Sequence, residues 1–229
     1  MRYDHIREAI FLDRPNRFIA HARLESGEIV TVHVKNTGRC RELLTPEARI
    51  LLQKCDDPSR KTGWDLISVY KGETLINMDS TAPNRVIGEW LRSGGIPGAG
   101  EIRPEVTRGD SRFDFGFSLE GRPAFAEVKG VTLEEEGVAR FPDAPSERAV
   151  KHLKGLKQAA EEGYPAYVIF LIQMKGVYLL EPNWRTHEAF GLALKEAAEA
   201  GVRILALDAV VTETSLTAGD PVPISLERG

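Results

Sequence analysis

The sequence has little cysteine, few aromatic residues and no long apolar run. Cys40 and Cys55 are the only cysteines among the 229 residues, so no disulfide framework is expected and a reducing compartment is the simpler interpretation. The longest strongly apolar run, residues 166–172, is far shorter than the roughly 20 residues that span a bilayer. Residues 1–18 are charged and resemble neither a signal peptide nor an anchor. We therefore expect a soluble, cytoplasmic protein with no membrane partner.

Several common catalytic motifs are absent as well. The five histidines show no HxH, HExxH or Cys/His spacing, which argues against a zinc site. The glycine-rich residues 94–100 lack the GKS or GKT of a P-loop, so they predict an ordinary loop. No nucleophile-elbow sequence is present, which argues against Ser-His-Asp chemistry.

The charge balance is mildly acidic. The net charge is −4 at pH 7 and the pI is about 5.8, which taken alone argues against a nucleic-acid partner. Residues 1–80 are nearly neutral, with 13 Lys and Arg against 12 Asp and Glu, so the acidic excess lies in the rest of the chain. A cation site needs carboxylates, and this acidity could supply them.

The first 80 residues predict β-structure. The predicted strands are residues 17–23, 28–34, 49–54, 64–70 and 73–78. The turns that separate them are Ser26-Gly27, Asn36-Thr37-Gly38, Asp56-Asp57-Pro58 and Lys71-Gly72. Five short, closely spaced strands are typical of a small closed barrel. A five-stranded OB-like barrel is the leading prediction, and an SH3-like barrel stays open as the alternative.

The pattern changes near residue 80, where we place the boundary between domains 1–80 and 81–229. Ser80 or Thr81 can cap a helix that has Pro83 in its first turn and stops at Gly94-Gly95. The further predicted strands are residues 102–107, 112–119, 123–129, 166–172, 177–180 and 202–207. The further predicted helices are residues 146–162 and 186–200, and residues 130–145 are a predicted long loop. This order indicates an α/β domain with a mixed sheet, in a two-domain chain.

One predicted hairpin brings two carboxylates and a lysine together. If its two-residue turn is centred on Gly121-Arg122, Asp114 lies opposite Lys129 and next to Glu127. Cross-strand partners and residues two apart share a face, so these three side chains point to one side. Phe113, Phe115, Phe117 and Val128 are then predicted to point to the other side, toward the core.

A hard divalent cation gives such a cluster a purpose. Mg²⁺ takes one or two carboxylates and keeps waters that a substrate can displace, and Mn²⁺ is the alternative. A lysine beside it can orient a water or stabilise developing negative charge. The string D…ExK is short and recurs by chance in charged chains. Its place here, with the element order α-β-β-β-α-β, resembles the PD-(D/E)xK nuclease fold.

Longer stretches resemble the sugar fermentation stimulation protein A family. They are RPNRFIAHARL, HVKNTGRCRELLTP, RKTGWDL, PNRVIGEWL, IRPEV, SRFDF, AEVKGVTL, FPDAPSERAVKHL and VIFLIQ, within residues 14–173. The resemblance implies an OB-like domain followed by a PD-(D/E)xK-like domain, DNA binding, and a link to regulation of sugar (maltose) metabolism. The family commonly has EVKS or EVKN, whereas Gly130 follows Lys129 here.

The predicted site residues follow from the hairpin and the resemblance together. The catalytic set is Asp114, Glu127 and Lys129. The metal-binding set is Asp114, Glu127, Val128 and Glu89. Glu105 and Gln173 are weaker candidates, for which an exposed carboxylate and a strand cap are the plain alternatives.

Basic residues predict the contacts to nucleic acid. The set is Arg14, Arg17, Arg39, Arg112, Arg148 and Lys151. A solvated helix face is the alternative for Arg148 and Lys151, pairing with the carboxylate is the alternative for Arg112, and the barrel residues rest mostly on the resemblance. Lys154 and Lys157 continue the spacing of Arg148 and Lys151, with His152 beside them. In the barrel, Lys35 and Arg41 are further basic candidates, and Phe18, Trp64 and Tyr70 are the aromatics that could stack on bases.

Three functions fit these observations. The first is a Mg²⁺- or Mn²⁺-dependent nuclease acting on nucleic acid, with DNA the expected substrate. The second is a DNA-binding regulator that keeps a nuclease fold without turnover. The third is an OB-type adaptor that binds only protein. The oligomeric state stays open, and a homo-oligomer is compatible with the sequence.

Overall fold

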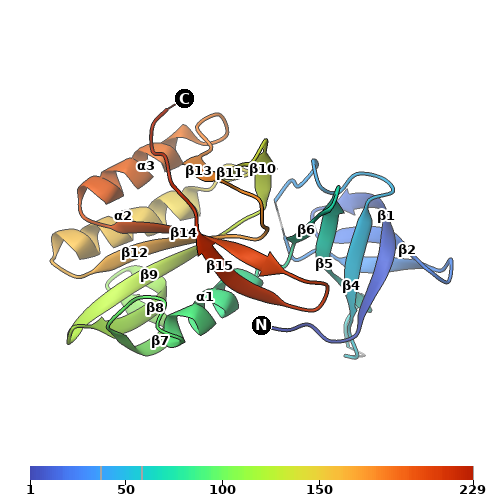
Figure 1. Cartoon of the computed structure of the whole chain (residues 1–229), viewed down its shortest axis with the longest axis horizontal. Helices are drawn as coiled ribbons and strands as arrows, with labels where there is room; N and C mark the ends of the chain where they lie inside the picture. Colours follow the sequence, from blue (N-terminus) through green and yellow to red (C-terminus); the bar gives the residue numbers. More distant parts are fainter. Residues whose placement is uncertain (37, 58, 229) are drawn as a thin grey trace.

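The computed structural model describes residues 1–36, 38–57 and 59–228. We describe it in two parts, a β-barrel and an α/β sandwich, which lie side by side in Figure 1. Thr37 and Pro58, which belong to two of the predicted turns, lie outside the described residues. Within them, no helix is long and apolar enough to cross a membrane.

The barrel is a sheet of mostly antiparallel strands that closes on itself. Its strands are β1 (Ile6–Asn16), β2 (Ile19–Leu24), β3 (Ile29–His33), β4 (Arg49–Lys54), β5 (Trp64–Lys71) and β6 (Thr74–Asn77). The sheet order is β3-β2-β1-β4-β5-β6, and a parallel pairing of β3 with β5 closes the ring. Strands β1 to β5 therefore form a five-stranded closed barrel, and β6 extends the sheet outside it.

The number of barrel strands is as predicted, but their membership differs. Strand β1 is not predicted by the sequence, in which it belongs to a charged terminal segment, and only two of its eleven residues are buried. It nevertheless pairs with both β2 and β4 at the centre of the sheet order. The predicted fifth strand, β6, pairs only with β5 among the described strands.

The second part is a mixed sheet between layers of helices. Its helices are α1 (Ala82–Arg92), α2 (Glu147–Glu161) and α3 (Glu188–Glu199). Its strands are β7 (Ala99–Arg108), β8 (Ser111–Leu119), β9 (Arg122–Val131), β10 (Leu133–Glu135), β11 (Val138–Phe141), β12 (Ala166–Ile172), β13 (Leu179–Pro182), β14 (Arg203–Val211) and β15 (Leu216–Pro221).

The main sheet has the order β15-β14-β12-β9-β8-β7. Strand β12 runs parallel to β9 and β14, and the other neighbours are antiparallel, which confirms the mixed sheet. Helix α1 covers one face, and α2 and α3 lie on the other (Figure 1). The predicted order α-β-β-β-α-β is present, with two short strands inserted after β9.

Those insertions correct the loop predicted at residues 130–145. Strands β10 and β11 form a hairpin there, and β11 pairs in parallel with β13 in a small separate sheet. Strand β15 was also not predicted. Both segments are short or carry many polar residues, so neither has a clear apolar alternation.

Buried residues run continuously from the barrel into the sandwich. One core joins Val34 and Leu43 of the barrel to Val131 and Met174 of the second part. The backbone N–H of Asn77, at the end of β6, donates to the carbonyl oxygen of Gln173 at 2.9 Å. The barrel thus packs against the carboxyl ends of β9 and β12.

Candidate active site

The β8–β9 hairpin sets the position of the carboxylates. Leu119 pairs with Arg122, so the turn residues are Glu120 and Gly121. Both have positive φ, as a type I′ turn requires. The prediction of a turn on Gly121-Arg122 is therefore wrong, and the register is shifted by two residues. A shift of two keeps the side chains of the paired residues, Phe115 to Leu119, on their predicted face, and Asp114 still lies beside Glu127, whose charge raises its pKa.

The regular pairing of the two strands ends at Phe115 and Ala126. Beyond it, the carboxylate of Asp114 takes the place of a backbone partner. Its Oδ2 accepts a hydrogen bond from the backbone N–H of Val128 at 2.8 Å, and its Oδ1 accepts one from Nδ2 of Asn84 at 2.8 Å. Asp114 is therefore fixed both to β9 and to the first turn of α1.

The predicted apolar face of β8 is wrong at Phe113, on the other side of Asp114 from Phe115. Phe115 and Phe117 pack in the core beneath α1, whereas Phe113 packs with Phe125 in the core beneath α2. Alternation would put all three β8 phenylalanines on one side. The alternation is broken at Asp114, where the pairing with β9 has ended, although residues 111–113 remain paired with β7.

Glu127 is buried in an asymmetric environment. Its residue is 2% exposed, and its Oε1 accepts a hydrogen bond from Lys129 Nζ at 2.7 Å and a contact from His152 Nδ1. Its Oε2 is buried with no hydrogen-bond partner among the described residues. A buried carboxylate oxygen without a partner carries a large desolvation penalty, so this atom is suited to a cation.

The two carboxylates have pKa values shifted in opposite directions. Burial raises the pKa of Asp114 above its ordinary value, and the charge of Glu127 adds to the rise. Burial alone would also raise the pKa of Glu127, but the hydrogen bond from His152 and the charge of Lys129 together lower it. Separated carboxylate pKa values are a common feature of catalytic sites, although ion pairs in structural networks produce them too.

A cleft of about 400 Å³ opens beside Asp114. It lies between the β7–β8 turn and the first turns of α2, and its lining is Glu105, Asp110, Ser111, Arg112, Phe113, Asp114, Arg148, Lys151 and His152. The predicted basic residues Arg112, Arg148 and Lys151 therefore meet around one hollow. Glu105 lines it as well and pairs with Arg112 at 2.6 Å on the exposed rim.

Other predicted site residues lie elsewhere. Glu89 accepts a hydrogen bond from the Met1 amino group at 2.7 Å, and its side chain is 54% exposed. At 3.6 residues per turn it lies roughly 140° around α1 from Asn84, which faces Asp114. Gln173 lies at the junction with the barrel, where its Nε2 donates to Asn77 Oδ1 at 2.9 Å.

In the barrel, Arg14 and Lys35 bond to groups of the protein itself, whereas Arg17 stacks on an exposed aromatic ring. The Arg14 guanidinium donates to the backbone carbonyls of four residues, Arg17, Asn36, Gly38 and Arg39, at 2.8–3.0 Å. It is therefore occupied in holding two loops together. Arg17 stacks over the exposed ring of Phe18, with its guanidinium carbon 4.7 Å from the ring centroid, and Lys35 pairs with buried Asp65 and Asp79.

Two residues at the centre of the site were not predicted to be there. Asn84 belongs to the first turn of α1, and no pattern in the sequence distinguishes it from a solvated polar residue. His152 follows Arg148 by four residues on α2, a spacing that puts both on one face of a helix. That spacing is the available signal, but a basic stripe on a helix does not by itself indicate contact with Glu127.

The residues present fit a hard divalent cation. Among residues 1–36, 38–57 and 59–228, no group of three His, Cys, Asp or Glu residues converges on one point. Mg²⁺ needs only one or two carboxylates and keeps its waters, so Asp114 and the unpartnered Oε2 of Glu127 suffice. The chemistry of the donors therefore agrees with a magnesium-type site rather than with zinc.

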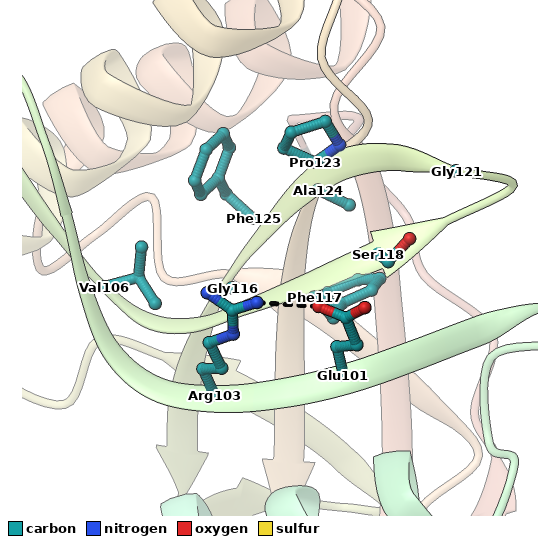
Figure 2. A pocket seen from close by; sticks show the side chains of 10 residues that line it. All are labelled: Glu101, Arg103, Val106, Gly116, Phe117, Ser118, Gly121, Pro123, Ala124 and Phe125. Carbon is teal, nitrogen blue, oxygen red and sulfur yellow. Dashed lines mark hydrogen bonds and ion pairs between the residues drawn. The ribbon is translucent and has the colours of Figure 1, made fainter.

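A second hollow, of about 320 Å³, lies along β7 and the β8–β9 hairpin (Figure 2). It contains the ion pair of Glu101 with Arg103 at 2.6 Å, and both side chains are mostly exposed. The rest of its lining is largely apolar or glycine, including Val106, Gly116 and Phe125. It holds no second carboxylate, so the cleft beside Asp114 is the stronger candidate for catalysis.

Fold and site together define a class: a closed β-barrel joined to an α/β domain whose mixed sheet carries a buried carboxylate, a half-buried one beside it, and a lysine. Two family descriptions match it. "SfsA N-terminal OB domain" matches residues 12–78, which decides between the two predicted barrels, and "Sugar fermentation stimulation protein RE domain" matches residues 81–215.

Full-length relatives agree with these matches. A sugar fermentation stimulation protein homolog from Desulfitobacterium hafniense strain Y51 is 56% identical over 229 residues, which is 100% of both chains. One from Clostridium beijerinckii is 50% identical over 227 residues, covering 99% of this chain and 100% of the relative. The chain belongs to the sugar fermentation stimulation protein family.

A solved structure has the same fold. It is described as Pyrococcus furiosus SfsA in complex with Ca²⁺, and it matches with a TM-score of 0.88 at 26% identity over 98% of both chains.

Proposed function

We propose that this protein is a divalent-metal-dependent nuclease that hydrolyses phosphodiester bonds of nucleic acid, with DNA as the expected substrate. The observation that carries the proposal is the buried Oε2 of Glu127, left without a partner next to Asp114 and Lys129. The protein would act in the cytoplasm, and its barrel would help to hold the nucleic acid.

Asp114 and Glu127 would hold Mg²⁺ or Mn²⁺, together with the backbone of Val128, whose N–H already bonds to Asp114. Such a cation supplies Lewis-acid polarisation of the phosphate and a more acidic bound water. The complex of a related protein with Ca²⁺ supports a divalent cation in this family. We leave Glu89 out of the proposed set, because it lies on a different face of α1 from Asn84.

Lys129 is suited to orient the attacking water. Its ammonium group has three donors, and one of them bonds to Glu127 Oε1 at 2.7 Å. The remaining donors can bind a water and the negative charge that develops on the phosphoryl oxygens. Hydrolysis then forms a bond between the water oxygen and phosphorus and breaks one ester P–O bond.

The cleft is suited to hold the phosphate backbone. Arg112, Arg148 and Lys151 line it and balance its three carboxylates, so the cleft does not share the acidic excess of the whole chain. In the barrel, Arg17 with Phe18 and the nearby Arg39 would extend the contact, since a basic residue on an exposed aromatic ring is typical of single-strand binding.

A cleavage assay tests the proposal. Labelled single- and double-stranded DNA and RNA are incubated with Mg²⁺, Mn²⁺ or EDTA, using wild type and the isosteric Glu127→Gln variant. We expect metal-dependent cleavage by wild type and none by the variant. Cleavage that is equal in the two proteins would assign the activity to a contaminant and overturn the proposal.

The assay also distinguishes the non-catalytic alternative. Retention of nucleic acid in a gel, without cleavage in any metal, would identify a DNA-binding regulator of sugar metabolism on this fold instead. In that case Arg148→Ala and Lys151→Ala should each reduce the slope of log affinity against log salt by about 1. No retention even at low salt would favour a partner other than nucleic acid.

A further inference from the structure

The two oxygens of the Glu127 carboxylate differ in their hydrogen-bond partners. Oε1 lies against Nζ of Lys129 and Nδ1 of His152, whereas Oε2 has no partner among the described residues. A carboxylate with two donors on one oxygen cannot rotate without losing both of them. The direction of Oε2 is therefore set by the groups that hold Oε1.

The contacts of His152 determine which of its nitrogens carries the proton. Nε of Arg148 lies 3.3 Å from Nε2 of His152, and a guanidinium can only donate. Nε2 is therefore assigned as the acceptor, which leaves the proton on Nδ1. Nζ of Lys129 lies 3.4 Å from the same Nδ1 but is closer to Glu127 Oε1, at 2.7 Å, and is assigned as a donor to that oxygen. The Nδ1–H then donates to Glu127 Oε1, so the imidazole is a neutral bridge from Arg148 to the carboxylate.

Helix α2 holds this bridge in place. Its N-terminus is capped by Ser146, whose hydroxyl accepts a hydrogen bond from the backbone N–H of Ala149. Leu153, next to the histidine, is fully buried, and Gly155 lies against Ser111 of β8. The His152 side chain is itself only 18% exposed. The imidazole thus has little freedom to follow Glu127 if the carboxylate moves.

We infer that His152 is a positioning residue that, bonded to Arg148 behind it, fixes the Glu127 carboxylate so that Oε2 stays directed at a divalent cation. This inference rests on the proposed metal-dependent function. It also connects the cleft wall to the carboxylate pair, because Arg148 lines the cleft and bonds to the same imidazole. Groups that orient a metal ligand from behind commonly affect metal affinity by 10–100-fold.

The test compares Mn²⁺ binding, measured by calorimetry, in His152→Leu and His152→Asn. Leucine fills the space without a donor, whereas the amide nitrogen of asparagine can take the place of Nδ1. We expect His152→Leu to weaken Mn²⁺ binding by about 10–100-fold and His152→Asn to restore most of it. Unfolding temperatures of both variants, measured without metal, establish that each protein is folded.

A second measurement does not depend on metal. In the metal-free wild type, NMR of the imidazole should show an exchange-protected Nδ1–H that is lost in Glu127→Ala. The opposite tautomer, with the proton on Nε2, would overturn the inference. Equal Mn²⁺ affinity in wild type and His152→Leu would overturn it too, while leaving the proposed function intact. A wild type that shows the Nδ1–H but binds no Mn²⁺ would overturn the metal-dependent function, and the inference with it.

Discussion

At the residue scale, the site depends on two acidic groups placed in unlike surroundings. Asp114 has hydrogen bonds from a backbone N–H and an amide, and no cation of the described residues pairs with it, whereas Glu127 has an ammonium group and an imidazole. The ionised form of Asp114 is therefore less stabilised than that of Glu127 when no metal is present. A bound cation would stabilise it, since it adds the positive charge that Asp114 lacks.

This difference predicts a pH-dependent stability. The folded-state pKa of Asp114 is raised, so its contribution to stability is full below its unfolded pKa and is lost as the pH rises through the folded value. At pH 7 the ionised carboxylate therefore destabilises the metal-free protein. Asp114→Asn should raise the metal-free melting temperature at pH 7 by about 2–4 °C, which corresponds to roughly 1 kcal/mol in a chain of this size.

Melting curves with EDTA at pH 7 and at pH 3.5 check this prediction. The gain should shrink at the lower pH, where the carboxyl group is protonated in both the folded and the unfolded protein. A variant that is less stable than wild type at pH 7 would show that the hydrogen bonds of Asp114 outweigh the burial of its charge.

Alternation along a strand accounts for Glu127 and Lys129, which lie two residues apart and bond to each other. Asp114 lies where the alternation of β8 is broken, and its hydrogen bond from the backbone N–H of Val128 keeps it beside Glu127. Asn84 and His152 could not be found in this way. Their contacts depend on how α1 and α2 pack on the sheet, and alternation along a strand holds no information about that packing.

At the scale of elements, close packing holds α2 against β8. Gly155 lies in the middle of α2, and a Cβ there would be 2.4 Å from Oγ of Ser111. In an exposed helix, Gly→Ala stabilises by about 1 kcal/mol. Here the added methyl group would push α2 away from β8, and His152 with it.

Gly155→Ala should therefore destabilise the protein, by about 1–3 kcal/mol as in other overpacked interiors. Chemical denaturation measures the change. Combining it with Ser111→Ala removes the Oγ and should recover part of the loss, which makes the double variant the matched control. A Gly155→Ala protein more stable than wild type would contradict the packing described here.

The loops of the barrel depend on one side chain. Arg14 bonds to four carbonyls of two loops, and lysine cannot replace that planar set of donors. Arg14→Lys should lower stability by about 2 kcal/mol, or about 4–8 °C in melting temperature. Arg17→Lys, an exposed neighbour, is the control and should melt like wild type. Equal melting of both variants would mean that the four bonds contribute little.

The elements that the sequence predicted best are those with a clear period. The apolar run of β12 and the capped helix α2 are close to their predicted bounds, because burial of a whole strand and a Ser146 cap have direct sequence signals. Strands β1 and β15 were missed. Neither has a clear apolar alternation of its own; β1 is paired with both β2 and the sequence-distant β4, and β15 with its hairpin partner β14.

At the scale of the whole molecule, the barrel and the sandwich share one buried core. Gln173 joins them further, since its amide donates to both oxygens of Asn77 and to the carbonyl of Asp79 at 2.9–3.2 Å. It is 2% exposed, so water does not replace these bonds when they are lost. We expect the two parts to unfold together in one transition.

Gln173→Ala should destabilise that single transition by about 2–4 kcal/mol, because it leaves buried acceptors unsatisfied at the junction. Differential scanning calorimetry measures both the midpoint and the number of transitions. Gln158→Ala, an exposed glutamine on α2, is the control and should change the midpoint little. Two separate transitions in wild type would contradict a shared core.

The proposed cation site of the whole molecule consists of Asp114 and Glu127. Calorimetric titration of Mn²⁺ into wild type, Asp114→Asn, Glu127→Gln and Glu89→Gln tests this most directly. We predict binding to wild type and to Glu89→Gln, and a loss of at least about 100-fold in the other two variants, which exceeds the effect of an outer residue. Unchanged binding in Asp114→Asn and Glu127→Gln would contradict the account, as would a loss confined to Glu89→Gln.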